Sequence, residues 1–182
     1  MINEKSEYIC HYLSALGNVT FASDGESLTG LWLEGQKYYE STLQGTIEEK
    51  ELPVFELTKK WLDIYFTGRE PDIKVPLAPK GSAFRRKVWR ILGEIPYGQV
   101  ITYGEIAGRI AGEEGKATMS AQAVGGAVGH NPISIIIPCH RVVGSDGSLT
   151  GYAGGLDIKI RLLELEQADM TNLYRPLKGT AL

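Results

Sequence analysis

The sequence predicts an α/β (α+β) fold, in which a small N-terminal antiparallel sheet with a helix precedes a mainly helical C-terminal domain containing a helix-turn-helix. Three observations favour this class: apolar and polar residues alternate early in the chain, prolines gather at residues 69–81, and helical periodicity dominates afterwards. We therefore expect an N-terminal α/β domain with its linker at 1–80, a C-terminal domain at 81–170 and a tail at 171–182.

The N-terminal part has the pattern of a β-meander followed by one helix. Residues 7–13 and 18–34 are expected strands, interrupted by the turn signal Asp24-Gly25. Pro53 then opens an amphipathic helix that ends near Gly68. Its apolar positions at helical spacing are Val54, Leu57, Trp61, Ile64 and Tyr65.

The C-terminal part contains the start signals of several helices. Ser82 can cap a helix whose apolar stripe is Phe84, Val88, Ile91, Leu92 and Ile95. Thr102 and Glu105 form a capping box that opens a helix running to about Ile110. A loop at 112–116 leads to a second helix that begins near Thr118 or Ser120, and this outline is typical of a helix-turn-helix. A further helix is expected at 156–168.

Composition limits the protein's environment and partners. No apolar run approaches the ~18 residues that span a bilayer, and residues 1–7 lack the features of a signal peptide, so a cytoplasmic monomer is expected. The net charge of −3 argues against a nucleic-acid-coating protein but permits a local basic cluster. That cluster is Lys80, Arg85, Arg86, Lys87 and Arg90. With only Cys10 and Cys139, no disulfide framework is expected, and a reducing compartment suits two free thiols.

The stretch 135–144 is the main candidate for chemistry. Three isoleucines end at Pro138, which prevents a paired central strand from continuing and places Cys139 where the core meets a turn. A nearby imidazole or cation, as in His140 or Arg141, lowers a thiol's pKa and makes it nucleophilic. A structural buried cysteine is the alternative. Cys10-His11 has no second ligand pair at metal spacing, so we favour a strand pair and expect no metal.

Two other segments carry unusual residues. From Ala121 to Gly129, six of nine residues are alanine or glycine, so another structure must approach this helix backbone closely. Another helix of the same core is one candidate. In the helix at 156–168, Lys159 and Glu166 fall within the apolar arc and need partners, because unpaired buried charge is costly. Glu166 can pair with Lys159 or with another basic group.

Three motifs occur in a specific order along the chain. Pro138-Cys139-His140-Arg141-Val142 follows Gly125-Gly126-Ala127-Val128-Gly129-His130-Asn131-Pro132 and precedes Gly151-Tyr152-Ala153-Gly154-Gly155-Leu156. Together they resemble the methylated-DNA–protein-cysteine methyltransferases, the O6-alkylguanine-DNA alkyltransferases. The resemblance is strongest from Phe84 to Glu166 and weaker around Gly30-Leu31-Trp32 and Lys80-Gly81. It implies a DNA repair enzyme that acts on double-stranded DNA with alkylated bases.

The resemblance implies a single-turnover reaction and assigns residues to it. An alkyl group moves from O6 of a flipped-out guanine, with O4-alkylthymine as a second candidate substrate, to Cys139. His140 takes the thiol proton through a water and Glu166 orients the imidazole. Tyr103 rotates the nucleotide and donates a hydrogen bond to guanine N3, while Asn131 ties the DNA-binding helix to the active site. The remaining implied roles are a guanine pocket lined by Val128, Ser134, Val142, Tyr152 and Ala153, and minor-groove contacts from Ser120, Ala121, Gln122, Ala123, Gly125, Gly126 and the loop residue Lys116.

One position departs from the family pattern. Many members have an arginine where this chain has Gln122, and that arginine is implied to replace the flipped nucleotide in the base stack. Glutamine loses the cation and the planar stacking, so we expect weaker DNA affinity with retained chemistry. The loop before this helix is longer than in short relatives, and its Lys116 can supply a phosphate contact.

Two other functions stay open from the sequence. A damage sensor would bind alkylated DNA without accepting the alkyl group, but relatives of that kind lack the cysteine. A cysteine hydrolase would use Cys139 and His140, although such enzymes usually bring their histidine from a distant segment. No cofactor is expected, because the transfer needs none and the chain has no glycine-rich phosphate loop or dinucleotide fingerprint.

Overall fold

A computed structural model describes residues 6–177 of the 182-residue chain. The described chain divides into two compact units, one reaching Lys80 and including Pro132–Ser134, the other formed by Gly81–Asn131 and the chain from Ile135 onward. The expectation about a signal peptide rests mainly on residues 1–5, which lie outside the described residues, as does the end of the expected tail at 178–182.

The first unit is built on a four-stranded sheet in the order β3-β2-β1-β4. The strands β1 (Glu7–Ser14), β2 (Gly17–Ser23) and β3 (Leu28–Leu33) pair antiparallel, which confirms the expected meander. The short β4 (Ile47–Glu49) pairs parallel with β1 and was not predicted, because its three residues are all exposed and show no apolar alternation.

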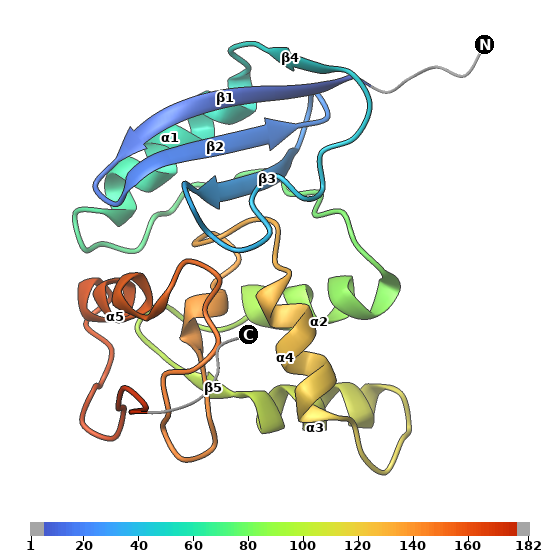
Figure 1. The fold of residues 1–182 in the computed structure, drawn as a ribbon, viewed down its shortest axis with the longest axis vertical. Helices are drawn as coiled ribbons and strands as arrows, with labels where there is room; N and C mark the ends of the chain where they lie inside the picture. Colours follow the sequence, from blue (N-terminus) through green and yellow to red (C-terminus); the bar gives the residue numbers. More distant parts are fainter. Residues whose placement is uncertain (1–5, 178–182) are drawn as a thin grey trace. The chain divides into compact units, whose positions relative to one another are not determined.

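Helix α1 (Pro53–Tyr65) packs against this sheet, as Figure 1 shows behind β1 and β2. Phe55 contributes to the shared core, with its ring centroid 5.9 Å from that of Phe21. Leu57, one of the five apolar positions at helical spacing, is 36 % exposed, while Phe55, Thr58 and Leu62 are buried. The buried stripe is therefore rotated along the helix relative to the predicted one.

Residues 132–134 join the free edge of β3. Leu31 N donates to Pro132 O over 2.8 Å, and Ser134 N donates to Leu31 O over 2.9 Å. The Ser134 hydroxyl also donates to Gln36 Oε1 over 3.0 Å. The next residue, Ile135, has a φ of 70°, a left-handed conformation that is rare for a β-branched side chain. This local strain marks the point where the chain leaves the strand edge.

The second unit is mainly helical. Its helices are α2 (Ala83–Gly93), α3 (Tyr103–Glu113), α4 (Ala121–Gly129) and α5 (Leu156–Leu165), and its short parallel pair consists of β5 (Ile101–Thr102) and β6 (Val142–Val143). The predicted Ser82 cap and the Thr102–Glu105 capping box are both present. Helix α5 ends at Leu165 rather than at the predicted 168, because Gln167 takes a left-handed φ of 56°.

Helices α3 and α4 form the expected helix pair, and α4 packs on both α2 and α3. The Trp89 indole donates to Ala127 O over 2.8 Å, so a side chain of α2 bonds directly to the backbone of α4. The segment at residues 170–174 packs on this unit as well, since Met170 and Leu173 contact a core formed by Val143, Leu149, Leu163 and Ala168. The sheet-bearing first unit and the helical second unit confirm the predicted fold class.

Among residues 6–177, no helix is both long enough and apolar enough to cross a membrane.

Candidate active site

A single 3-10 turn at Cys139–Arg141, directly before β6, carries the three candidate residues. Cys139 is 4 % exposed, His140 is fully buried and Arg141 is 7 % exposed. The preceding isoleucines are turn residues rather than strand residues, and Cys139 N donates to Ile137 O over 2.8 Å. Cys139 therefore lies where the core meets a turn, as predicted, but Pro138 ends no strand, because the chain already turns at Ile135.

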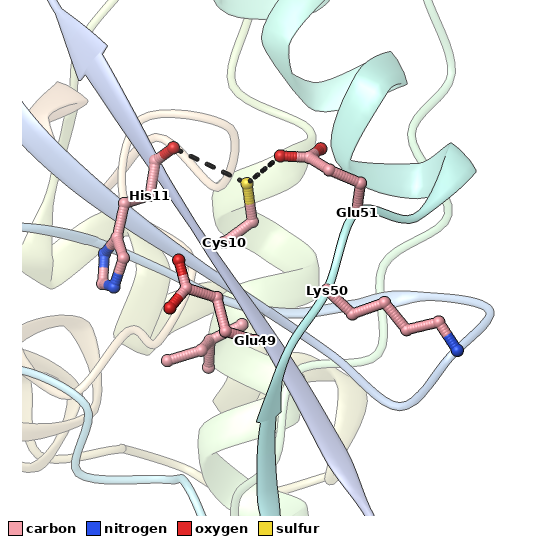
Figure 2. Close-up of a pocket in the computed structure, with 6 residues that line it drawn as sticks. Cys10, His11, Glu49, Lys50 and Glu51 are labelled. Carbon is pink, nitrogen blue, oxygen red and sulfur yellow. Dashed lines mark hydrogen bonds between the residues drawn. The ribbon is translucent and has the colours of Figure 1, made fainter.

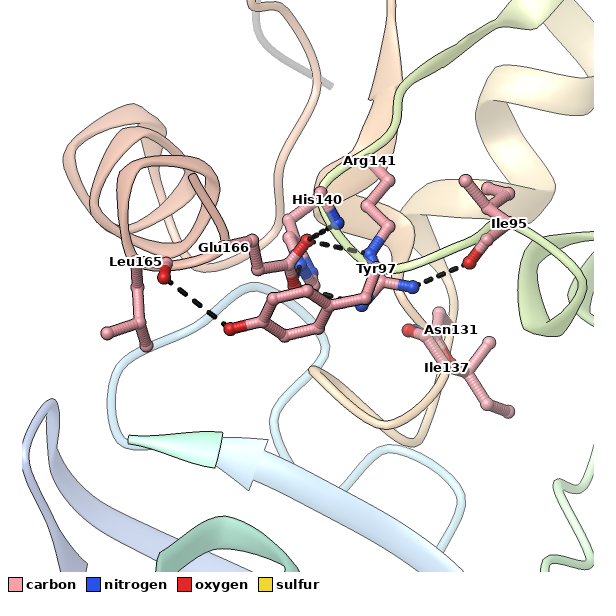
Figure 3. Close-up of polar contacts among 9 residues, drawn as sticks. Ile95, Tyr97, Asn131, Ile137, His140, Arg141, Leu165 and Glu166 are labelled. Atoms are coloured by element: carbon pink, nitrogen blue, oxygen red, sulfur yellow. Dashed lines mark hydrogen bonds and ion pairs between the residues drawn. The ribbon is translucent and has the colours of Figure 1, made fainter. Parts of the chain in front are cut away.

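A buried carboxylate joins His140 and Arg141, as Figure 3 shows. Glu166 Oε1 lies 2.6 Å from His140 Nε2, and Arg141 donates from Nε to Oε2 over 2.8 Å and from Nη2 to Oε1 over 3.0 Å. Burial alone would raise the pKa of Glu166, but its bonds to His140 and Arg141 lower that pKa to about 2. Glu166 is therefore ionised at neutral pH.

The imidazole of His140 rests neutral beside this carboxylate. Burial lowers the pKa of His140, against the opposing effect of Glu166. A carboxylate only accepts hydrogen bonds, so His140 Nε2 carries the proton and Nδ1 has the basic lone pair. A neutral imidazole held in one tautomer is the state that a general base requires.

The Cys139 sulfur accepts a hydrogen bond from Asn131, the second residue after α4. Asn131 Nδ2 donates to Cys139 Sγ over 3.1 Å and to Ile137 O over 2.7 Å. Burial raises the pKa of the Cys139 thiol, while the Asn131 hydrogen bond and the charge of Lys159 lower it. The resting sulfur is therefore a thiol whose ionised form has two stabilising neighbours.

Lys159 of α5 is fully buried next to the turn that carries Cys139. Its Nζ donates to Val142 O over 2.5 Å and to Thr150 O over 2.8 Å. Burial lowers the pKa of Lys159 to about 8. The sequence left open which basic group meets Glu166, and the structure joins Glu166 to His140 and Arg141 while tying Lys159 to backbone carbonyls.

Two tyrosines surround the same region. The Tyr152 ring meets His140 edge-on, with ring centroids 6.4 Å apart, and its buried hydroxyl has no hydrogen-bond partner among the described residues. Tyr103, the first residue of α3, donates from its hydroxyl to Thr150 O over 3.1 Å. Val142 directly follows the turn that carries Cys139, and Ala153 directly follows Tyr152. Val128 is buried in α4, and Ser134 belongs to the sheet-bearing unit.

The residues predicted to contact DNA differ in exposure. The exposed ones form the start of α4 and the loop before it, and they are Lys116, Ser120, Ala121, Gln122 and Ala123. Gly125 is buried with its Cα facing the Tyr103 ring, whereas a Cβ at Gly126 would meet nothing within 4 Å. A Cβ at Gly125 would lie 3.8 Å from the Tyr103 ring, an ordinary van der Waals contact, so this packing does not by itself require glycine. Lys116 forms an ion pair with Glu114 over 2.7 Å, and Glu114 also binds Lys87 over 2.6 Å.

One contact to Glu166 was not predicted. Gly98 N donates to Glu166 Oε2 over 3.2 Å, and Gly98 has a φ of 73°. A Cβ at this position would lie 2.8 Å from Glu166 O, so the close approach requires glycine. The turn signal Pro96-Tyr97-Gly98 is visible in the sequence, but its partner is 68 residues away.

The second cysteine lies in a different environment, shown in Figure 2. Cys10 Sγ donates to Glu51 Oε1 over 3.1 Å at a cavity of about 220 Å³ lined by Ile9, Cys10, His11, Glu49, Lys50 and Glu51. Burial and Glu51 raise the pKa of Cys10 to about 11. Both cysteines are free, and the described part of the chain contains no group of three metal-ligating side chains.

These features define a protein with a buried thiol, a neutral imidazole fixed by a carboxylate, and an exposed helix start poor in side chains. Residues 8–79 match the ribonuclease-like domain of 6-O-methylguanine DNA methyltransferase, and residues 83–168 match its DNA binding domain. The chain belongs to the methylated-DNA–protein-cysteine methyltransferase family.

Individual relatives cover nearly the whole chain. The methylated-DNA–protein-cysteine methyltransferase of Haemophilus influenzae is 44 % identical over 161 residues, which is 88 % of this chain and 86 % of the relative. The protein of that name from Methanosarcina acetivorans is 42 % identical, over 87 % of this chain and 97 % of the relative. The crystal structure of Mycobacterium tuberculosis OGT in complex with DNA aligns with a TM-score of 0.73 and 38 % identity, covering 89 % of this chain and 92 % of that chain.

Proposed function

We propose that this protein repairs alkylated DNA by moving a methyl or larger alkyl group from O6 of guanine to Cys139. The observation that carries the proposal is the buried Cys139 with Asn131 donating to its sulfur, next to a His140 imidazole that Glu166 holds in one tautomer. Family membership supports it, since the relatives are named for transfer from methylated DNA to a protein cysteine. DNA as partner is supported by the DNA complex of the Mycobacterium tuberculosis protein.

The reaction follows from the site's geometry. Cys139 is almost fully buried, so a base must leave the duplex to reach it, at a cost of roughly a few kcal/mol. The thiol proton moves through a water to His140 Nδ1, since neighbouring residues of one turn do not face each other. The sulfur then attacks the alkyl carbon, the C–O6 bond breaks, and its electron pair stays on the guanine. Glu166 stabilises the imidazolium, which can return its proton to the leaving base.

Tyr103 and Tyr152 each form a hydrogen bond to the flipped base in this proposal. The Tyr103 hydroxyl would exchange its bond to Thr150 O for one to N3 of the leaving guanine. The buried Tyr152 hydroxyl gains a partner when a polar base enters next to His140.

The exposed start of α4, with Gln122, enters the minor groove, where short side chains allow close approach. A thiol that must stay reduced suits a cytoplasmic location.

Incubation with a duplex that carries labelled O6-methylguanine tests this function. We expect one methyl group per protein molecule and no further turnover, because a thioether is a stable product. Cys139→Ser should accept no label, and Cys10→Ser, the matched control, should accept as much as the wild type. Release of labelled methanol with turnover would indicate a hydrolase, and binding without transfer would indicate a damage sensor; either outcome contradicts the proposal.

A second prediction concerns DNA affinity. Gln122→Arg should tighten binding to an alkylated duplex by roughly tenfold, because arginine restores a cation that stacks and contacts phosphate. Lys116→Ala should weaken binding a few-fold and reduce the salt dependence by about one counterion, provided that Lys116 leaves Glu114 for a phosphate. Fluorescence anisotropy at several salt concentrations measures both effects. Lys60→Ala, an exposed lysine on α1, is the control, and unchanged affinity in both test variants would remove this account of the DNA contacts.

A further inference from the structure

Arg141 lies two residues after the nucleophile, and its side chain bonds to the Glu166 carboxylate. We propose that Arg141 is a positioning residue: its guanidinium fixes the Glu166 carboxylate at two points and balances its charge, so that the His140 imidazole is held in the orientation that proton transfer needs. The inference deepens the proposed function and rests on it. It follows from contacts within the helical unit alone.

Two hydrogen bonds from Arg141 clamp the Glu166 carboxylate. Arg141 Nε and Nη2 donate to different oxygens of Glu166, over 2.8 and 3.0 Å. Such a two-point contact fixes the plane of a carboxylate, which a single contact leaves free to pivot. Because Glu166 Oε1 is also the atom that meets His140 Nε2 at 2.6 Å, the clamp sets the direction of the imidazole.

Arg141 is itself anchored by the turn at residues 95–98. Its Nη1 donates to Ile95 O over 2.6 Å, and its guanidinium lies 5.6 Å from the centre of the Tyr97 ring. Tyr97 in turn donates from its hydroxyl to Leu165 O over 3.4 Å, as Figure 3 shows. The turn at residues 95–98 and the end of α5 are thus held together around one guanidinium. Lysine has a single ammonium and cannot make this set of contacts.

Charges of both signs surround the His140 imidazole. The charged and aromatic groups around it are Arg141 from its own turn, Tyr152 from the following loop, and Lys159 and Glu166 from α5 and its end. Glu166 favours the imidazolium, whereas burial and the cations Arg141 and Lys159 oppose it. Loss of the Arg141 charge leaves Glu166 less neutralised, and the imidazole then becomes easier to protonate.

Two variants separate the charge from the clamp. In Arg141→Met, transfer per folded molecule should fall by roughly a hundredfold, and the acidic limb of the rate–pH profile should move up by roughly half a unit or more. In Arg141→Lys, which keeps the charge, the rate should fall by roughly tenfold while the acidic limb stays near its wild-type position. Arg161→Met, an exposed arginine on α5, is the control. Circular dichroism gives the folded fraction.

A second readout needs no DNA. The ¹⁵N signals of the His140 ring, assigned among only three histidines, report its titration directly. We expect the midpoint to rise in Arg141→Met and to stay in place in Arg141→Lys. Should Arg141→Met fail to fold, the slower rate of Arg141→Lys at an unchanged midpoint carries the inference. A purely structural Arg141 would lower the melting temperature while leaving rate and midpoint unchanged, and that result would overturn the proposal. Absence of transfer in the wild type would instead contradict the proposed function.

Discussion

Glu166→Gln is expected to slow alkyl transfer by roughly a hundredfold to ten-thousandfold, the range typical of losing general acid–base catalysis. The amide cannot stabilise an imidazolium, and its NH2 group can turn toward His140 Nε2 and force the other tautomer. Single-turnover rates on a methylated duplex measure the effect. Glu164→Gln, at an exposed position in the last turn of α5, should transfer at the wild-type rate. A Glu166→Gln rate within a few-fold of the wild type would show that no carboxylate is needed.

The same substitution should also lower the free energy of unfolding. It leaves the buried Arg141 guanidinium without its carboxylate, and breaking such a pair costs roughly 3–5 kcal/mol. The pKa of Glu166 is lowered in the folded protein to about 2, from 4.5, so its stabilising contribution is present above pH 4.5 and is lost as the pH falls toward 2. Urea titrations across this range should show the loss in the wild type and a weaker pH dependence in Glu166→Gln.

Lys159→Met should slow transfer by roughly tenfold to a hundredfold while leaving most of the stability intact. Lys159 is the cation that lowers the pKa of the Cys139 thiol, so its removal leaves less thiolate. Methionine has a similar length to lysine and removes the buried charge, which stabilises the folded protein. It also leaves Val142 O and Thr150 O without their donor, which destabilises the folded protein, so the two effects oppose each other. Arg161→Met again supplies the exposed control.

The pH dependence of stability provides a separate check on Lys159. Its pKa falls from 10.5 in the unfolded chain to about 8 in the folded protein, so the folded state gives up the proton first. Stability should therefore rise between pH 8 and 10.5 in the wild type, because only the unfolded chain holds this proton there. In Lys159→Met this rise should be smaller. Equal slopes in the two proteins would mean that the lysine is not buried as described.

Local signals predicted much of the fold and several of the unusual residues. The Thr102–Glu105 capping box and the Ser82 cap depend on neighbouring residues, so the sequence shows them directly. Helical spacing placed Lys159 and Glu166 on the apolar face, and both are buried. Pairings between distant segments were missed, as with β4 beside β1 and Gly98 beside Glu166, because periodicity carries no information about which distant backbone completes a contact.

The resemblance and the geometry contributed different parts of the site. The motif around Cys139 identified the family but gave Arg141 no catalytic role, and its two bonds to Glu166 appear only in the structure. The glycine content predicted that another structure approaches the backbone of α4 closely. It did not distinguish Gly125, which faces Tyr103, from the open position at Gly126. That distinction depends on the packing of α4 against α3, which the composition of α4 alone does not determine.

Peptide mass mapping after reaction with an O6-methylguanine duplex identifies the cysteine that receives the alkyl group. We expect the peptide containing Cys139 to gain the mass of one methylene group, the peptide containing Cys10 to keep its mass, and the DNA to recover unmodified guanine. Methyl groups on Cys10, or guanine repaired while Cys139 remains a free thiol, would contradict transfer to Cys139.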